Sequence, residues 1–406
     1  MLYRLDEKAQ ILPIIAIALI AIVLLAAVIL DGGTLMSNRR TAQAAADAGA
    51  LAGAKVYCDT RSESAAISAA TTYAINNRAD SAIVTVDEDG VTKVTVSVEI
   101  QQGSFFAKIF GRDELVSTAV AGAGCFPPDT YNGLLPVAWS CRPPVGGSVS
   151  EDCEYFPLDW ETQIKPIADT YAGSPTDISQ QLFSAYNTAS GYYIYIIMDS
   201  DKTCGVDIDC DFNDDGKNEI ESGGNRGWLN LEGTSSGTPN LTGWIQNGVS
   251  SPISVHTWFS GVDGNKTSVY SSMETRLDQI VWIPVFNVLC GDVPDLDDPN
   301  DPCILAAHAS TPPGLPLLEG EVENVLAGNP ATPMFHVIAF APFYITCVHK
   351  SGEICPGFEF ARTINPTIKA NTNTVEGYFV KDPPFVPGDV GTGGADLGNY
   401  VISLTK

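Results

Sequence analysis

The sequence predicts an α+β protein: a long amino-terminal transmembrane helix, a small α+β module, and a loop-rich, mainly antiparallel β ectodomain stapled by disulfides. Three observations indicate this fold class. Residues 11–30 are an unbroken apolar run, and helical and then alternating patterns occupy residues 31–124. From residue 125 onward, runs of β-branched and aromatic residues alternate with stretches rich in Gly, Ser, Asn, Asp and Pro.

Charge divides the chain at the same place. The formal net charge is −26; positions 1–124 hold 10 basic and 13 acidic residues, whereas positions 125–406 hold 12 and 35. A field of this sign repels phosphate backbones, so no nucleic-acid partner is expected. We predict four segments: 1–10, a short cytoplasmic tail; 11–30, the transmembrane helix; 31–124, an extracytoplasmic helix and α+β module; 125–406, the acidic, disulfide-rich β ectodomain.

The apolar run Ile11–Leu30 has the length of a bilayer span. At 1.5 Å per residue it covers about 30 Å, the thickness of the hydrocarbon core. A cleaved signal peptide is the rival interpretation, but its apolar region is usually shorter and ends at a small-residue cleavage site. Here the run continues into Asp31 and Arg39-Arg40. The sequence therefore predicts a helix that anchors the chain in a lipid bilayer.

The cysteines decide the predicted orientation. Ten cysteines without CxxC spacing favour disulfides, and disulfides persist in an oxidising compartment. We therefore expect a single-pass protein of the cell membrane, with a cytoplasmic amino terminus and an extracytoplasmic carboxy-terminal domain. Sequence alone does not select the connectivity. Pairing neighbours along the chain gives the hypothesis Cys141–Cys153, Cys204–Cys210, Cys290–Cys303 and Cys347–Cys355, which leaves Cys58 with Cys125.

Helical patterns continue after the membrane. Thr41–Val56 is rich in alanine, and Ala45, Gly49 and Gly53 recur every fourth residue, which places them on one helix face. This stripe of small residues favours close approach of another helix or sheet, although a self-association seam is a second interpretation. Thr60-Arg61-Ser62-Glu63 fits a capping box that opens a second helix, over about 62–77.

Alternation then replaces the helical period. Residues 83–88 and 91–100 alternate as two strands joined by a turn at Asp89-Gly90. Ser104–Phe110 is predicted as a short apolar helix, and Leu115–Ala123 as a third strand. Cys58 and Cys125 bracket this small α+β unit.

The ordered features of this region resemble a known family. They are Glu7, Ala9-Gln10, the apolar span, Asp31, Arg39-Arg40, the alanine-rich run from Gln43 to Ala54 and, more loosely, Phe105–Gly111. Together they resemble the amino-terminal region of TadE/TadG-like Flp pilus-assembly proteins, over roughly the first 124 residues. The resemblance is nearer to the uncleaved TadG-like members with large ectodomains, and it implies a pilin-like module.

Five runs in the acidic part are predicted strands. They are rich in β-branched and aromatic residues and are separated by turn-forming stretches. Their ranges are 192–198, 253–259, 280–288, 336–345 and 375–380.

The stretch from Asp207 to Glu221 contains the main candidate site, for calcium. Calcium takes 6 to 8 oxygen ligands, and acidic or amide side chains at alternate positions can supply them. One register begins at Asp211 as in an EF-hand, and the other at Asp209; in either, Glu219 or Glu221 would complete the shell. The alternative is a solvated acidic loop. The candidate ligands are Asp207, Asp209, Asp211, Asn213, Asp215, Glu219 and Glu221.

A second acidic loop lies between Cys290 and Cys303 and is a weaker cation candidate. Its acidic residues are Asp292, Asp295, Asp297, Asp298 and Asp301.

An enzyme is not expected. None of the four histidines has HxxxH or HExxH spacing, and P-loop and GxGxxG motifs are absent. His336 is expected to be a bonded core residue. Trp228, Trp244, Trp258 and Trp282 are expected in a β core rather than on a sugar-stacking surface.

The resemblance and the site together predict a minor pilin-like or accessory component of a Tad/Flp-type pilus-assembly or surface-adhesion system, with a calcium-stabilised ectodomain. Its expected partners are the bilayer through residues 11–30, other pilus or envelope assembly proteins or itself, and an extracellular ligand. The alternative is a cell-surface carbohydrate-binding module or hydrolase that uses the same anchor. A cleft with converged carboxylates would favour that alternative.

Overall fold

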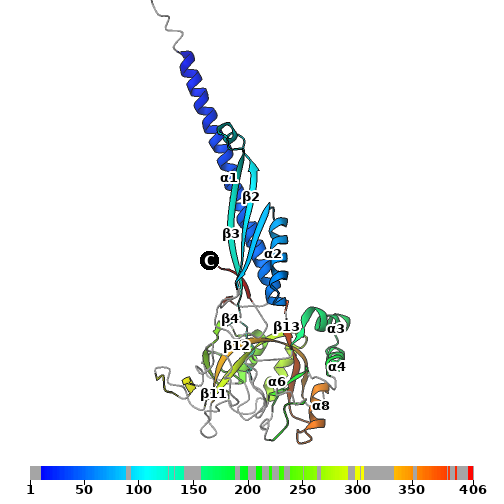
Figure 1. Cartoon of the computed structure of the whole chain (residues 1–406). Helices are drawn as coiled ribbons and strands as arrows, with labels where there is room; N and C mark the ends of the chain where they lie inside the picture. Colours follow the sequence, from blue (N-terminus) through cyan, green and yellow to red (C-terminus); the bar gives the residue numbers. More distant parts are fainter. Residues whose placement is uncertain are drawn as a thin grey trace, which may run out of the picture. The chain divides into compact units, whose positions relative to one another are not determined.

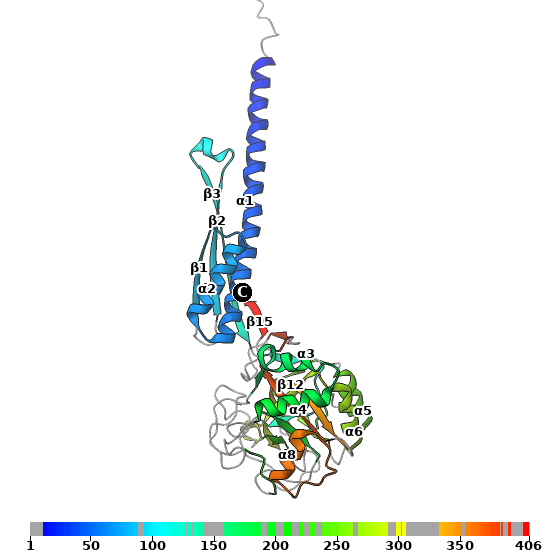
Figure 2. The same ribbon diagram turned by 90° about the vertical axis from the view of Figure 1, so that its right-hand side faces the viewer.

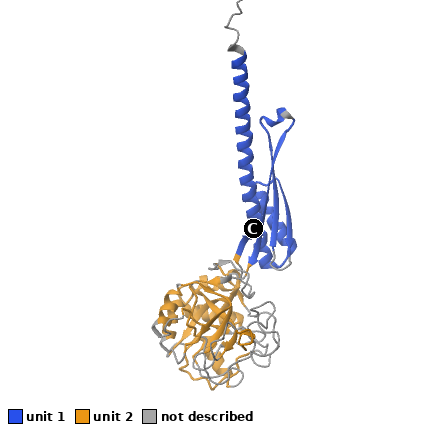
Figure 3. Cartoon of the chain, turned by 90° about the vertical axis from the view of Figure 1, so that its left-hand side faces the viewer, with its two compact units in different colours: residues 1–125, 402–406 blue, residues 126–401 orange. Residues whose placement is uncertain are grey.

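The chain divides into two compact units in its computed structural model. Unit 1 comprises residues 1–125 and 402–406, and unit 2 comprises residues 126–401 (Figure 3). The structure describes residues 11–87, 93–126, 128–131, 133–140, 157–187, 193–199, 207–212, 219–221, 228–232, 238–249, 251–262, 267–290, 298–301, 303–305, 333–350, 354–381, 383–384, 389–390 and 401–405. The predicted fold class is confirmed: a long apolar helix precedes mixed α+β structure in which antiparallel sheets dominate.

Two helices form one side of unit 1. α1 (Ile11–Thr60) is a continuous helix of 50 residues that joins the predicted span to the predicted alanine-rich helix. α2 (Glu63–Asn76) starts after Ser62, whose hydroxyl accepts a hydrogen bond from Ala65 N at 3.3 Å. The predicted capping box was therefore misplaced, since Ser62 is the N-cap. Thr60 instead donates its hydroxyl to Val56 O at 2.7 Å, inside the last turn of α1.

The sheet of unit 1 has the order β1-β2-β3-β15. β1 (Ser81–Asp87), β2 (Lys93–Gly103) and β3 (Glu114–Phe126) are antiparallel neighbours, as predicted, and the short helix η2 (Ala107–Phe110) joins β2 to β3 (Figures 1 and 2). The predicted Asp89-Gly90 turn lies outside the described residues. β15 (Val401–Thr405) comes from the far end of the chain, so unit 2 is inserted between two strands of one sheet.

Small side chains let α1 pack closely on α2 and β2. A Cβ added at Gly49 would lie 2.9 Å from Ala70 O, and one added at Gly53 would lie 2.8 Å from Val94 Cγ1. Ala45 is fully buried on the same face. The stripe of small residues therefore serves close packing inside unit 1, which is the interpretation favoured from the sequence.

The main sheet of unit 2 has the order β5-β11-β12-β13-β7-β8. Its longest pairings, β11 with β12 and β12 with β13, are antiparallel. β10 pairs with β12 and β6 with β13, and a second sheet has the order β14-β4-β9. The strands are β4 (Pro128–Tyr131), β5 (Trp139–Ser140), β6 (Leu158–Asp159), β7 (Tyr195–Met198), β8 (Ile220–Glu221), β9 (Ile253–Ser254), β10 (Thr257–Ser260), β11 (Ile280–Cys290), β12 (Met334–His349), β13 (Thr374–Lys381) and β14 (Asp389–Val390).

All five predicted strands of unit 2 are present, with different ends. The predicted strand 253–259 is interrupted, because His256 has φ +58° and separates β9 from β10. Helices also lie between the strands, and the sequence did not predict them. They are η3 (Trp160–Ile164), α3 (Lys165–Thr170), α4 (Pro175–Tyr186), α5 (Thr238–Asn247), α6 (Thr267–Met273), η4 (Glu274–Arg276) and α8 (Pro356–Ile364).

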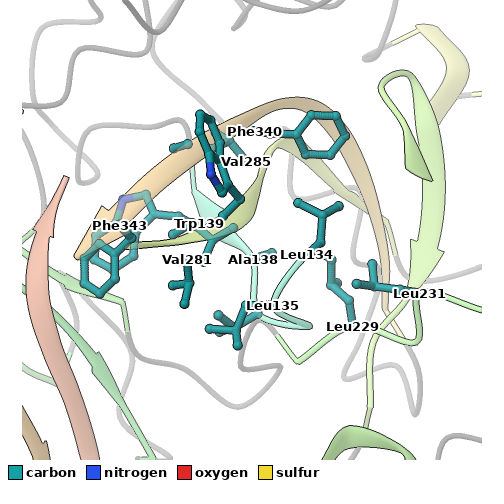
Figure 4. Packing of buried hydrophobic residues seen from close by; sticks show 14 of the residues in the cluster. Leu134, Leu135, Ala138, Trp139, Leu229, Leu231, Val281, Val285, Phe340 and Phe343 are labelled. Atoms are coloured by element: carbon teal, nitrogen blue, oxygen red, sulfur yellow. The ribbon is translucent and has the colours of Figure 1, made fainter. Parts of the chain in front are cut away.

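Both faces of the main sheet are buried. On β12 and β13, Phe343 and Phe379 belong to the largest hydrophobic cluster, which α5 and α6 also line, and Figure 4 shows part of it. Their neighbours Tyr344 and Tyr378 belong to a cluster on the other face that includes residues of η3 and α4. Because successive side chains of a strand point to opposite faces, this arrangement explains the nearly continuous apolar runs of the central strands.

Candidate functional site

Three disulfides agree with the predicted pairing of neighbouring cysteines. Cys58–Cys125 closes unit 1, and Cys290–Cys303 and Cys347–Cys355 lie in unit 2. Cys210 is also disulfide-bonded. Its predicted partner Cys204, and the predicted pair Cys141–Cys153, lie outside the described residues.

The acidic loop begins and ends on ordered backbone. Asp209 N donates to Asn365 Oδ1 at 2.8 Å, and Asn365 Nδ2 donates to Asp209 O at 2.7 Å, so the start of the loop is tied to the end of α8. Glu219 N donates to Cys210 O at 2.7 Å. Since Glu219 O in turn accepts from Ile196 N of β7, the base of the loop is fixed to the main sheet.

The candidate ligands at this base differ in exposure. Asp207 and Asp209 are exposed and Asp211 is partly exposed, and Asp209 Oδ1 accepts a hydrogen bond from Asp211 N at 3.1 Å. Glu219 is buried, and its Oε2 accepts from Phe212 N at 2.6 Å. These carboxylates therefore belong to the two ends of one closed loop.

The other candidate ligands cannot be placed in this way. Asn213 and Asp215 lie outside the described residues, and Glu221 is described only by its backbone in β8. Both registers of the predicted calcium loop remain predictions.

In the second acidic loop, the described carboxylates stabilise local turns. Asp301 Oδ1 accepts from Cys303 N at 2.8 Å, and Asp298 Oδ1 accepts from Asn300 N at 2.9 Å. Asp292, Asp295 and Asp297 lie outside the described residues. Aspartate side chains commonly accept such hydrogen bonds in turns, so the presence of Asp298 and Asp301 here is explained without a bound cation.

Most of the aromatic candidates are core residues. His336 is buried, its Nδ1 lies 2.7 Å from Asn287 Oδ1, and its ring packs on Trp258. The expectation of a bonded core histidine is therefore confirmed. Trp228, Trp244 and Trp282 are buried in the largest cluster, so these three indoles do not present a stacking surface for sugars.

A cavity of about 580 Å³ in unit 2 is the natural place to look for the cleft of the hydrolase alternative. Trp160, Arg276 and Gln279 are among its lining residues. Arg276 is engaged there, since its Nε donates to Ile245 O and its Nη1 to Gln279 Oε1. None of the described residues that line this cavity is a carboxylate.

One GxSxG match occurs at 233–237, in the sequence Gly-Thr-Ser-Ser-Gly. In hydrolases this motif places its serine between a strand and a helix. α5 begins directly after it at Thr238, whereas Trp228 and Leu229 before it make only isolated bridges. The motif itself lies outside the described residues.

Glu376 on β13 is a buried carboxyl group that was not predicted from the sequence. Its Oε1 accepts from Ser179 Oγ at 3.0 Å, and its Oε2 accepts from Phe358 N, also at 3.0 Å, so it joins α4 to the first turn of α8. Burial raises the pKa of Glu376 to about 7 against these hydrogen bonds. The sequence signal was an acidic residue inside the apolar run 375–380.

The surroundings of Glu376 do not make a metal site. Its carboxylate lies near the sulfur atoms of Cys347 and Cys355, with all three ligand atoms within 4.8 Å of one another. The two sulfurs are bonded to each other as a disulfide, so they are not available as thiolate ligands.

α1 is the one helix, among the residues that the structure describes, that is long and apolar enough to cross a membrane. Its side chains from Pro13 to Leu25 are all exposed, as expected for a segment that lipid would cover.

Comparison with known families bears on this same helix. Residues 9–56 match the family model described as putative Flp pilus-assembly TadE/G-like. The amino-terminal region is TadE/G-like. This TadE/G-like segment contains the apolar run and most of the small-residue face of α1, and it ends before α2. No curated protein and no solved structure matches the chain.

Proposed function

We propose that the chain is a membrane-anchored, extracytoplasmic component of a Tad/Flp-type pilus-assembly or surface-adhesion system, as a minor pilin-like or accessory protein. The TadE/G-like match over residues 9–56 carries the proposal. Its exposed apolar helix supports the anchor. The proposed binding partners of the protein are other pilus or envelope assembly proteins or a second copy of the chain, together with an extracellular ligand that binds unit 2.

The orientation proposed is a cytoplasmic amino terminus and extracytoplasmic units 1 and 2. Disulfides in both units support it, because such bonds form and persist in oxidising compartments. The experiment is labelling with a membrane-impermeant thiol reagent in cells whose outer layers are permeabilised. After reduction, the native cysteines should react, and a cysteine introduced as Leu5→Cys should not. The reverse pattern would contradict the orientation.

The pilus role has its own test. A strain that lacks this protein should lose surface pili or pilus-dependent adhesion, and the wild-type gene should restore them. A variant with residues 126–401 replaced by a short linker separates the roles of the two units, since all of β3 and β15 except Phe126 and Val401 belongs to unit 1. Normal piliation and adhesion in the deletion strain would contradict the proposal.

We also propose that the acidic loop holds calcium, through Asp209, Asp211, Asn213 and Asp215 with Glu219 or Glu221. The support is the spacing of the carboxylates and the ordered base of the loop at Cys210 and Glu219. Calcium would offset the repulsion among these acidic groups.

The alternative, a carbohydrate-binding module or hydrolase on the same anchor, has less support. The cavity with Trp160 and Arg276 lacks carboxylates among its described lining residues, and three of the four candidate tryptophans are buried. Binding to a glycan array by the full chain, together with turnover of a bound glycan, would favour the alternative.

A further inference from the structure

The loop between β2 and β3 is fixed to α1 at the point where the apolar run ends. Asp31 directly follows Leu30, and its carboxylate accepts hydrogen bonds from Phe105 N at 2.9 Å, Phe106 N at 3.0 Å and Ala107 N at 2.8 Å. Partial desolvation raises the pKa of Asp31, but these three amides outweigh it and hold the pKa below its usual value. The carboxylate is therefore charged at neutral pH and keeps this contact.

Hydrogen bonds close the loop at its neck. Ser104 closes its neck, because Ser104 N donates to Asp113 O at 2.9 Å and Ser104 Oγ donates to Arg112 O at 2.6 Å. Gly111 ends η2 with φ +81°, a left-handed conformation that glycine adopts without strain. The loop therefore holds its side chains in a defined place beside Asp31.

Two large apolar side chains of this loop are mostly exposed. Phe105 is 61% exposed and Ile109 is 74% exposed. The basic residues Lys108 and Arg112 lie beside them and are also exposed. Apolar side chains flanked by basic ones are typical of segments that lie in the headgroup region of a bilayer.

The position of Asp31 identifies the surface that meets this loop. A helical side chain leans toward the amino end of its helix, so groups bound to Asp31 lie at the level of the preceding turn, which belongs to the apolar run. α1 also first becomes partly buried at Ala26 and Ala27, within that run. The contact of the loop with Asp31 therefore lies at the carboxy-terminal end of the predicted span.

We propose that the η2 loop is a second membrane contact, in which Phe105 and Ile109 insert into the headgroup region of the phospholipid bilayer that α1 crosses. The inference rests on the proposed membrane anchor. It adds that Asp31 and the loop fix unit 1 directly against the bilayer surface. Lys108 and Arg112 would then lie among the lipid phosphates.

The test is photo-crosslinking of the full chain in vesicles of phosphatidylethanolamine and phosphatidylglycerol that contain a phospholipid with an alkyne-tagged acyl chain. The photoreactive residue p-benzoylphenylalanine replaces Phe105 in one variant and Ile109 in a second. Ile20, in the apolar run, is the positive control. Ile83 on β1 is the matched control, since it is 71% exposed and pairs with Ser97, about 20 Å along β2 from Gly103 at about 3.3 Å per residue.

The expected result is lipid adducts at positions 20, 105 and 109, with yields at 105 and 109 several-fold above the yield at 83. Adducts at 20, with positions 105 and 109 no higher than 83, would overturn the inference and leave the anchor intact. The absence of adducts at 20 would overturn the anchor, and the inference with it. Retention of the Cys58–Cys125 disulfide on non-reducing gels verifies that each variant is folded.

Discussion

Unit 1 buries small side chains where unit 2 buries large ones. Along α1, alanine and glycine residues pack against α2 and β2. At Gly49 the helices are so close that an added Cβ would contact the backbone oxygen of Ala70. In unit 2, aromatic rings such as Phe343 and Tyr378 fill both faces of the sheet. The same unit also buries two carboxyl groups, Glu219 and Glu376. The stability of unit 1 therefore depends on close packing of small residues and on contacts distant in sequence. The stability of unit 2 depends on large buried side chains and on buried polar groups.

The disulfides show the same difference and give the largest expected effect. Cys58–Cys125 has a sequence separation of 67, whereas Cys347–Cys355 has a separation of 8. The chain-entropy relation assigns about 4 kcal/mol to the first loop and about 2.5 kcal/mol to the second. In one variant Cys58 and Cys125 are both replaced by alanine, and in a second variant Cys347 and Cys355 are. The free energy of unfolding should fall by about 4 kcal/mol in the first and about 2.5 kcal/mol in the second.

The measurement is denaturant unfolding of the full chain in detergent micelles, with hydrogen exchange in α2 and β13 to separate the units. Alanine is preferred to serine because all four cysteines except the half-buried Cys347 are buried, and a buried hydroxyl would add a cost of its own. An equal loss from the two pairs would contradict the view that unit 1 relies more on its long-range tie.

The second prediction concerns pH and unit 2. Burial raises the pKa of Glu376 to about 7 in the folded protein, from its ordinary value of 4.5. Because the folded state keeps this proton while the unfolded state has lost it, stability should fall as pH rises from 4.5 to about 7. At 1.36 kcal/mol per pKa unit, the loss is about 3 kcal/mol.

Glu376→Gln should flatten this part of the pH profile, because the amide cannot ionise. Other carboxyl groups titrate too, so the measured quantity is the difference between wild type and variant in unfolding free energy at several pH values. Tyr378, whose pKa is raised well above 10 first by burial and then by the charge of Glu376, stays protonated throughout this range. Parallel profiles for the two proteins would show that Glu376 does not titrate in this window.

The features that could be predicted from the sequence also differ between unit 1 and unit 2. In unit 1 the decisive signals are local: a helical stripe of small residues, alternation in β2, and one apolar run. β15 was missed because it pairs with β3 from the far end of the chain, and no local pattern identifies such a partner.

In unit 2 the strands were predictable from β-branched and aromatic runs, but the helices between them were not. α8 is short, and it is stabilised by contacts distant in sequence, such as the hydrogen bond from Phe358 N to Glu376. The role of Glu376 depends on Ser179, which lies far from it along the chain and meets it only in the fold. For the acidic loop, the sequence identified the residue types, and the described structure adds the closed base at Cys210 and Glu219.

The third prediction is that calcium stabilises unit 2 and leaves the stability of unit 1 unchanged. If the loop binds an ion that the unfolded chain does not, a hundredfold excess over Kd stabilises the fold by about 2.7 kcal/mol. The full chain should melt several degrees lower in chelator than in millimolar calcium, and sodium should not replace calcium. Hydrogen exchange should change in β7 and α8, not in α2.

Asp211→Ala with Asp215→Ala should remove most of the calcium effect, because the pair deletes two charged ligands and leaves the disulfides intact. The matched control is Asp169→Ala with Asp177→Ala, two exposed carboxylates of the same unit, which should melt with the wild-type response to calcium. If wild type and the Asp211/Asp215 variant melt alike in calcium and in chelator, the acidic loop is only a solvated surface.

The smallest predicted effect is a reversal of sign between the units for the same substitution, glycine to alanine. Inside a helix, alanine is favoured over glycine by up to about 1 kcal/mol. At Gly243 in α5 the added methyl group has no atom within 4 Å, so Gly243→Ala should stabilise unit 2 by up to that amount.

At Gly49 the methyl group would lie 2.9 Å from Ala70 O and 3.2 Å from Ala74 Cβ. A backbone carbonyl inside a helix cannot move aside without shifting α2, and overpacking of this kind typically costs about 1 to 3 kcal/mol. Gly49→Ala should therefore destabilise unit 1, seen as faster hydrogen exchange in α2, while Gly243→Ala slows exchange in α5. Slower exchange in α2 of the Gly49 variant would mean that the helices of unit 1 can separate at little cost, and that close fit is not what holds them together.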